Sequence, residues 1–240
     1  LDALFVIWLR WGVAGAAAAT VIAQGVSAVY CFMVLRSIPL VLPEKEDMRL
    51  QKGTVGRLVR LGTPTALQNA VIGVGGTAIQ RVINDYGTVV VAAFTATNKL
   101  YGLMEMAAVS LGGALSAYTG QNWGARKYNR IRRGTRSGAM MALAVSFLIT
   151  GGLYVLGRPV LSLFIEAEDP SIIQNCLDVA QAYLNAMLVG LFVLYLLYIY
   201  RSALQGMGDT VTPMVSGLVE LIMRVSAVLV LPLFFGQTGL

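Results

Sequence analysis

The stretch YLNAMLVGLFVLYLLYIY, residues 183–200, runs for eighteen residues without a charged side chain. A helix needs about 20 mostly apolar residues to cross the hydrocarbon core of a bilayer. Two further apolar runs are VSAVYCFMVL (26–35) and SGAMMALAVSFLITGGLYVLG (137–157). The whole chain of 240 residues is 57% hydrophobic and 12% charged, whereas a soluble domain has about a quarter of its residues charged. We therefore predict an all-α, polytopic membrane protein.

Turn residues between the apolar runs predict six nearly complete spans and a preceding stub. The expected helices cover residues 13–35, 57–84, 89–118, 137–165, 172–205 and 212–235, after a stub at 1–10. Pro64 lies inside the second of them, which is tolerated where neighbouring helices satisfy the freed carbonyl. Because the chain opens on Leu1 within an apolar segment, we expect a fragment of a longer protein.

Lysine and arginine alternate strictly between successive connections. Residues 36–60 carry six, 85–88 none, 120–138 six, 166–171 none, and 201–210 one, Arg201. Cytoplasmic loops of membrane proteins carry the excess of basic residues. The pattern places loops 36–56, 120–136 and 206–210 in the cytoplasm, beside anionic lipid. Nucleic acid binding would not explain the alternation, so we expect no nucleic acid partner.

Residues that would support catalysis or metal binding are scarce. The sequence has no His, no Gly-rich phosphate loop ahead of a Lys, and no cluster with metal-ligand spacing. Cys31 and Cys176 both lie in or near apolar runs and are expected to be small core residues. We expect no enzyme, no metal and no cofactor.

Ionisable residues inside apolar segments are costly there and therefore mark candidate functional positions. Glu220 and Arg224 lie four residues apart in VSGLVELIMRVSAVLVLP, which places them on one helical face in ion-pair reach. One interpretation is a structural pair that fixes this helix to a neighbour. The other is a charge pair that rearranges on protonation or ligand binding.

Glu105 is the best single candidate for a carboxylate that faces a cavity. It lies near the middle of the span at 89–118, seven residues from Asn98 and on the same face. Lys99 is six residues from Glu105 and does not share that face, so each needs its own partner. The alternative is an acid satisfied by neighbouring helices.

Other polar and aromatic candidates occur in two of the spans. Gln68 and Asn69 follow Pro64 and would either line a cavity or hydrogen-bond neighbouring helices. Asn185 lies with Asp178 and Gln181 at helical spacing. Tyr195 and Tyr198 would suit a flat organic cation, or would simply pack between helices.

Four ordered stretches resemble the MATE (multidrug and toxic compound extrusion) transporters. They are GVAGAAAATVIAQ (12–24), PTALQNAVIGVGG (64–76), LGGALSAYTGQNWGARKYNRIRRG (111–134) and RSALQGMGDTVTPMVSGLVELIMR (201–224). The resemblance implies twelve helices in two six-helix lobes. Residues 1–35 would then end the N-terminal lobe, 36–56 would link the lobes, and 57–240 would form an incomplete C-terminal lobe. The N-terminal lobe itself would be the missing partner.

The function that the resemblance implies is secondary antiport at the cell (plasma or inner) membrane. Such proteins export organic, often cationic compounds in exchange for protons or sodium. The family's best-known proton site, an Asp on helix 1, is not in this sequence. Its sodium site on helices 7 and 10 is not matched either, since 58–84 has no Asp or Glu and the middle of the tenth helix is Leu194 and Tyr195.

Two alternatives to drug antiport stay open from the sequence. A lipid-linked glycan flippase of the same superfamily should show a cationic cavity for pyrophosphate, for which the sequence offers Arg81, Lys99 and Arg224. A membrane scaffold that transports nothing would be indifferent to the loss of Glu105 or Glu220.

Overall fold

The computed structural model describes the chain apart from residues 2, 9, 39–50, 166–169 and 236–240. Within the described residues every regular element is a helix, which confirms the all-α prediction. The chain divides into two compact units, Leu1–Gly56 and Arg57–Leu240.

The first unit contains a short π-helix, η1 (Leu4–Trp8), and the helix α1 (Gly12–Arg36). A tight corner joins them, with positive φ angles of 52° at Arg10 and 57° at Gly12. The rings of Phe5 and Trp11 stack across this corner with centroids 5.4 Å apart. The break predicted between the stub at 1–10 and the helix at 13–35 is therefore confirmed.

Five long helices follow, four of them wholly within the second unit. They are α2 (Lys52–Asn84), α3 (Thr88–Gly124), α4 (Tyr128–Ser162), α5 (Pro170–Gly206) and α6 (Val211–Phe235). The predicted turns at 85–88 and 206–210 are confirmed, whereas the turn predicted at 166–171 lies mostly outside the described residues. The predicted loop 120–136 is wrong in extent: only residues 125–127 interrupt the helices, because arginine and lysine are good helix formers.

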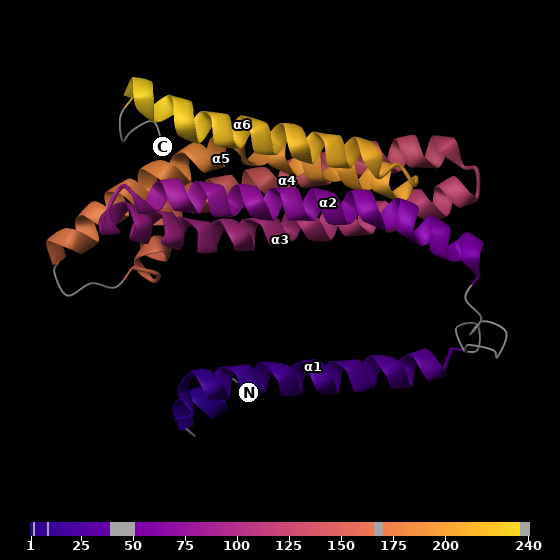
Figure 1. Cartoon of the computed structure of the whole chain (residues 1–240), viewed down its shortest axis with the longest axis horizontal. Coiled ribbons are helices and arrows are strands. Elements are labelled where there is room, and N and C mark those ends of the chain that lie inside the picture. Colours follow the sequence, from indigo (N-terminus) through magenta and orange to yellow (C-terminus); the bar gives the residue numbers. More distant parts are fainter. Residues whose placement is uncertain (2, 9, 39–50, 166–169, 236–240) are drawn as a thin grey trace. The chain divides into compact units, whose positions relative to one another are not determined.

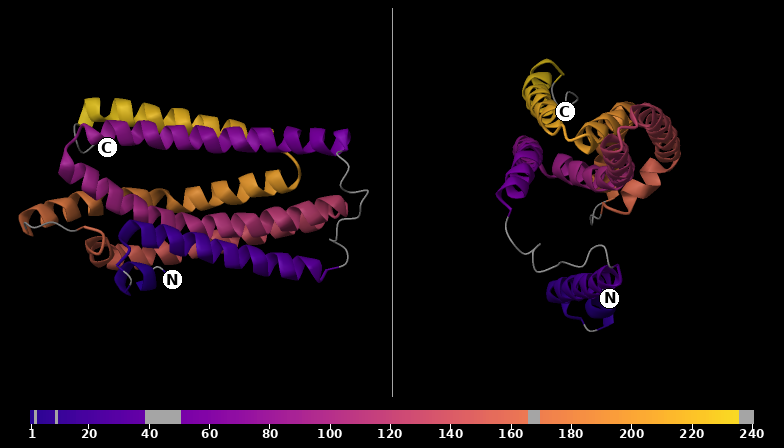
Figure 2. Two further views of the ribbon diagram at one scale, coloured as in Figure 1. Left: turned by 60° about the horizontal axis from the view of Figure 1, so that its bottom comes forward. Right: turned by 90° about the vertical axis from the view of Figure 1, so that its right-hand side faces the viewer.

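Helices α3, α4 and α5 pack against one another and form the core, and α6 meets α5 near the turn that joins them (Figures 1 and 2). Leu161 of α4 and Leu184 and Leu191 of α5 are almost completely buried in it. At one end α3 and α5 approach so closely that a Cβ on Gly206 would collide with Thr119 and with the backbone of Ser116. The turns 125–127 and 207–210 therefore lie at the same end of this unit.

Five of the described helices are long and apolar enough to cross a membrane: α1, α3, α4, α5 and α6. Helix α2, predicted as a sixth span, has 33 residues but a more polar sequence that includes Gln68 and Asn69. It nevertheless reaches α5 through a hydrogen bond between Gln68 and Gln205, and α6 through a contact between Gly75 and Leu221. The protein is a multi-pass membrane protein.

Candidate functional site in the membrane-spanning bundle

A pocket of about 210 Å³ lies where α2, α3, α5 and α6 come together, well inside the helices. It gathers four charged side chains from three of these helices. Its lining consists of Ile72, Gly75, Gly76, Tyr101, Glu105, Tyr198, Arg201, Glu220, Leu221 and Arg224. Three of the nine site residues predicted from the sequence, Glu105, Glu220 and Arg224, bring their charges here, and Tyr198 joins them.

Glu220 of α6 is held by two arginines. Its Oε2 lies 2.9 Å from an Nη2 of Arg201 on α5, and its Oε1 lies 2.7 Å from Nη2 of Arg224 one turn further along α6. Arg201 also donates to the hydroxyl of Ser216 through Nε and Nη2, at 3.2 and 2.9 Å. The side chains of Arg201 and Glu220 are only 9% and 18% exposed. This network joins α5 to α6 and neutralises Glu220.

Glu105 of α3 has a different environment. The hydroxyl of Tyr198 on α5 donates a hydrogen bond to its Oε1. Within the described part of the chain, none of the ion pairs involves Glu105. The two carboxylates of the pocket are therefore unlike: Glu220 has cationic partners, and Glu105 has a neutral one.

The α2 wall of the pocket is built from small residues. A Cβ on Gly75 would collide with the side chain of Leu221 on α6, so the glycine allows these two helices to meet. Its neighbour Gly76, which also lines the pocket, has open space beside it. The two glycines thus have different roles in this wall: Gly75 allows α2 to contact α6, and Gly76 leaves free volume in the pocket.

The two amides predicted on α2 separate in the structure. Gln68 is buried, accepts a hydrogen bond of 3.3 Å from Nε2 of Gln205 on α5, and packs against Gly217 of α6. It joins three helices. Of the two roles predicted for it, it therefore hydrogen-bonds a neighbouring helix rather than lining a cavity. Asn69 instead lines a separate pocket of about 590 Å³ together with Gln205 and Thr210.

Three of the predicted residues lie away from the charged pocket. Tyr195 is fully buried and its hydroxyl donates to the Met104 carbonyl at 2.7 Å, which is a packing role. Asn185 is exposed and accepts a hydrogen bond of 2.9 Å from Gln181 one turn earlier. Asn98 is half-buried on α3 and does not line the charged pocket.

Sequence reasoning missed two residues of the site. Arg201 was counted among the basic residues of the 201–210 connection, and that assignment is wrong: α5 continues to Gly206, so Arg201 lies inside the helix and is buried. Tyr101, which shares the pocket with Glu105 and Arg224, carried no charge signal. One turn separates Tyr101 from Glu105, and that helical spacing could have identified it.

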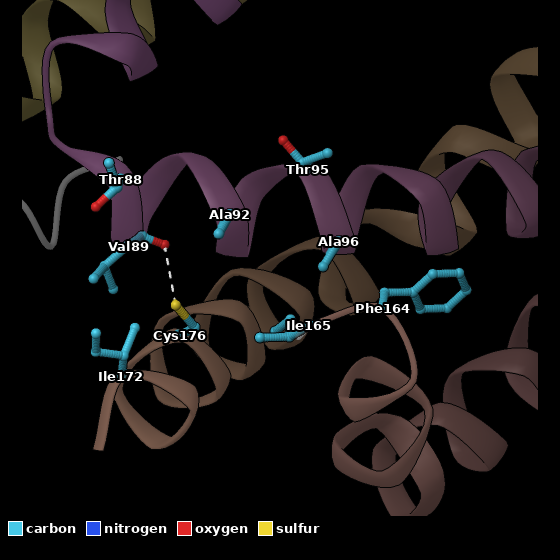
Figure 3. Close-up of a pocket in the computed structure, with 9 residues that line it drawn as sticks. All are labelled: Thr88, Val89, Ala92, Thr95, Ala96, Phe164, Ile165, Ile172 and Cys176. Atoms are coloured by element: carbon cyan, nitrogen blue, oxygen red, sulfur yellow. Dashed lines mark hydrogen bonds between the residues drawn. The ribbon is translucent and has the colours of Figure 1, made fainter. Parts of the chain in front are cut away.

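A second pocket, of about 340 Å³, lies at the opposite end of the bundle between the starts of α3 and α5 (Figure 3). Cys176 is buried there and its thiol donates to the Val89 carbonyl at 3.7 Å. The rest of the lining is apolar apart from the hydroxyls of Thr88 and Thr95. The buried thiol behaves as the small core residue that the sequence predicts, whereas the same prediction is wrong for Cys31, which is exposed on α1.

Comparison with known proteins identifies the family. The sequence model of the family described as MatE matches residues 64–230, which include every residue that lines the charged pocket. The chain belongs to the MatE family. The resemblance stated from the four ordered stretches is thereby confirmed.

Two relatives from Bacillus subtilis (strain 168) are named probable multidrug resistance proteins. YpnP is 31% identical over 173 residues, covering 70% of this chain and 38% of YpnP. YoeA is 28% identical over 168 residues, covering 67% of this chain and 35% of YoeA. The chain thus spans less than two fifths of the length of these relatives.

Solved structures show the same fold over the full length of the chain. A MOP superfamily transporter from Pyrococcus furiosus matches with a TM-score of 0.90 at 19% identity, over 54% of its own length. A variant of the Vibrio cholerae MATE transporter VcmN matches with a TM-score of 0.87 at 19% identity, over 53% of its length.

Proposed function

We propose that this chain forms part of a secondary antiporter that exports organic, often cationic compounds in exchange for protons or sodium. The observation that supports it most directly is the charged pocket among α2, α3, α5 and α6 in a MatE chain. Buried ionisable groups inside membrane helices mark ion or substrate pathways. The names of YpnP and YoeA as multidrug resistance proteins support the substrate class.

Within this proposal the two carboxylates have separate roles. Glu220 lies between Arg201 and Arg224, so its charge is compensated and its role is to hold α5 against α6. Glu105 faces the Tyr198 hydroxyl and has no cationic partner among the described residues. A carboxylate of that kind is suited to accept a proton or a cation. We assign coupling to Glu105.

The proposed setting is the cell (plasma or inner) membrane, with the turns 125–127 and 207–210 on the cytoplasmic side. Both turns lie at one end of the bundle, since Gly120 and Gly206 meet there. The basic residues around the first turn support the cytoplasmic assignment. The N-terminal lobe of the same protein would supply the rest of the substrate pathway.

The test is efflux of a fluorescent organic cation from proteoliposomes that hold the full-length protein. A proton gradient is imposed first, then a sodium gradient, each without the other. Efflux driven by either gradient supports the antiporter and identifies the coupling ion. Absence of efflux under both gradients would contradict it, and translocation of a lipid-linked sugar would be assayed next.

The flippase alternative has less support. A pyrophosphate site needs cationic groups that are not already neutralised. In the charged pocket both arginines pair with Glu220, and Glu105 adds a further acid. Arg81 and Lys99, the other two cations considered from the sequence, are exposed and do not line this pocket.

A further inference from the structure

Six cationic side chains gather at the corner where α3 ends and α4 begins. They are all exposed, and we call them the basic corner: Arg126, Lys127, Arg130, Arg132, Arg133 and Arg136. In the described part of the chain none of the six takes part in an ion pair. Elsewhere in the same unit Arg158 pairs with Asp178 at 2.8 Å. The basic corner thus presents uncompensated charge on one surface.

The length of α4 places the basic corner at the depth of lipid headgroups. Helix α4 has 35 residues and is therefore about 52 Å long. Its apolar stretch begins at Ser137 and suffices for the hydrocarbon core of about 30 Å. Residues 128–136 must then extend about 13 Å beyond the hydrocarbon, through the headgroup layer of about 5–8 Å that holds the phosphate groups.

An aromatic pair lies at the same corner. The rings of Trp123 at the end of α3 and Tyr128 at the start of α4 meet edge to face, with centroids 5.4 Å apart. They are 47% and 57% exposed. Exposed Trp and Tyr side chains are enriched at the boundary between hydrocarbon and headgroups. The length of α4 places Tyr128 about 13 Å outside the hydrocarbon, so this pair joins the end of α3 to the start of α4 rather than marking that boundary.

The backbone beneath the basic corner is well fixed. The amide of Lys127 donates to the Asn122 carbonyl at 2.8 Å, and Asn122 Nδ2 donates to the Tyr118 carbonyl at 2.8 Å. The Tyr118 hydroxyl donates to the Arg130 carbonyl at 3.2 Å, and its ring lies against Gly134. The cationic side chains are thus presented from an ordered frame rather than from a long loop.

The closely spaced positive charges of the basic corner attract anions from outside the protein. Arg130, Arg133 and Arg136 follow one another at intervals of three residues, and Arg132 lies four before Arg136, so like charges are neighbours on the helix surface. Ile131 and Ala139 are buried against the bundle, which leaves the arginines on the outward side. The N-terminus of a helix carries a partial positive charge, and the first turn of α4 has no acidic residue to balance it.

We propose that the basic corner binds the phosphate groups of anionic phospholipids in the folded protein. Arginine presents a planar fork that donates two hydrogen bonds to one phosphate. Clusters of four to eight basic residues just cytoplasmic of a membrane helix attract anionic lipid. A role in orienting the chain during insertion needs only positive charge and would leave the folded protein indifferent to headgroup. Lipid binding instead makes the folded protein respond to the charge of the lipid headgroup.

The test measures the Kd of detergent-solubilised full-length protein for phosphatidylglycerol by native mass spectrometry, with phosphatidylcholine as the uncharged reference. The triple variant Arg130→Gln, Arg133→Gln, Arg136→Gln should raise the Kd for phosphatidylglycerol at least about tenfold. The matched control removes the same charge from exposed cations that lie outside the two basic stretches, by Arg10→Gln, Arg81→Gln and Lys99→Gln, and should leave that Kd nearly unchanged.

Two outcomes would overturn the proposal: an unchanged Kd in the α4 triple variant, or an equal loss in both triple variants. The corresponding Arg→Lys triple at 130, 133 and 136 keeps the charge and should bind within a few-fold of the wild type. If the Gln triple variant does not fold, the salt dependence of phosphatidylglycerol binding by the wild type tests the proposal instead. Phosphatidylglycerol binding that does not weaken as salt is raised would contradict an electrostatic site.

Discussion

Arg201 of α5 and Glu220 of α6 form an ion pair of 2.9 Å whose side chains are 9% and 18% exposed. In the sequence the first looks like a loop charge and the second like half of a local pair with Arg224. In the structure they join two helices across the wall of the charged pocket.

Replacing Arg201 by Gln is expected to destabilise the protein by about 3 kcal/mol. Removal of one partner from a buried pair leaves the other charge undercompensated, here with only Arg224 remaining. The matched control is Arg158→Gln, which breaks an exposed pair with side chains 48% and 63% exposed and should cost less than about 1 kcal/mol. Thermal unfolding of the full-length protein in detergent measures both stabilities. An equal loss of stability in the two variants would contradict the claim that the buried pair contributes more than the exposed one.

Gly206→Ala is expected to destabilise the protein by about 1–3 kcal/mol, because the new Cβ collides with Thr119 and with the Ser116 backbone of α3. A backbone neighbour cannot move aside cheaply. Gly190 lies in the interior of the same helix with open space beside it. Gly190→Ala should therefore be neutral or stabilising by up to about 1 kcal/mol. A shift of both thermal midpoints in the same direction would rule out the close α3–α5 crossing.

Tyr198→Phe tests whether the hydrogen bond to Glu105 matters for transport. The substitution keeps the ring and removes the hydroxyl that Glu105 accepts from. Such bonds in membrane proteins contribute on average about 0.6 kcal/mol, so stability should change little while gradient-driven efflux falls. Tyr195→Phe removes a hydroxyl bonded to the Met104 carbonyl and should leave efflux intact. Equal efflux in the two variants would remove Tyr198 from the mechanism.

Asp209, in the turn before α6, should make the start of that helix sensitive to acid. Hydrogen bonds from the Thr212 hydroxyl and amide, and from the Val211 amide, lower the pKa of Asp209. Because the folded pKa lies below the unfolded value near 4, the stabilisation is present above that value and is lost as pH falls through the folded pKa. Asp209→Asn should therefore lose less stability between pH 7 and pH 3 than the wild type does. An identical pH dependence would show that the carboxylate is not the cause.

The membrane helices could be predicted because hydrocarbon selects long apolar runs, as in 183–200. The corner between α3 and α4 could not be placed, since its basic residues favour helix as well as loop. Arg201 lies inside the predicted helix 172–205, but its count among the charges of the 201–210 connection hid its burial against α6. The bond between Glu105 and Tyr198 joins residues 93 positions apart and depends on tertiary packing, which periodicity on one helix does not contain.

The role of Glu105 in coupling is decided by comparing Glu105→Gln with Asp178→Asn in proteoliposomes of the full-length protein. Asp178 is an exposed carboxylate at the other end of the bundle, paired with Arg158, and serves as the matched control. Two rates are followed: efflux of the organic cation driven by the coupling gradient, and exchange of labelled substrate without a gradient. Our account predicts that Glu105→Gln abolishes the driven efflux and retains exchange, while Asp178→Asn retains both. Full gradient-driven efflux by Glu105→Gln at every pH would contradict the assignment of coupling to Glu105.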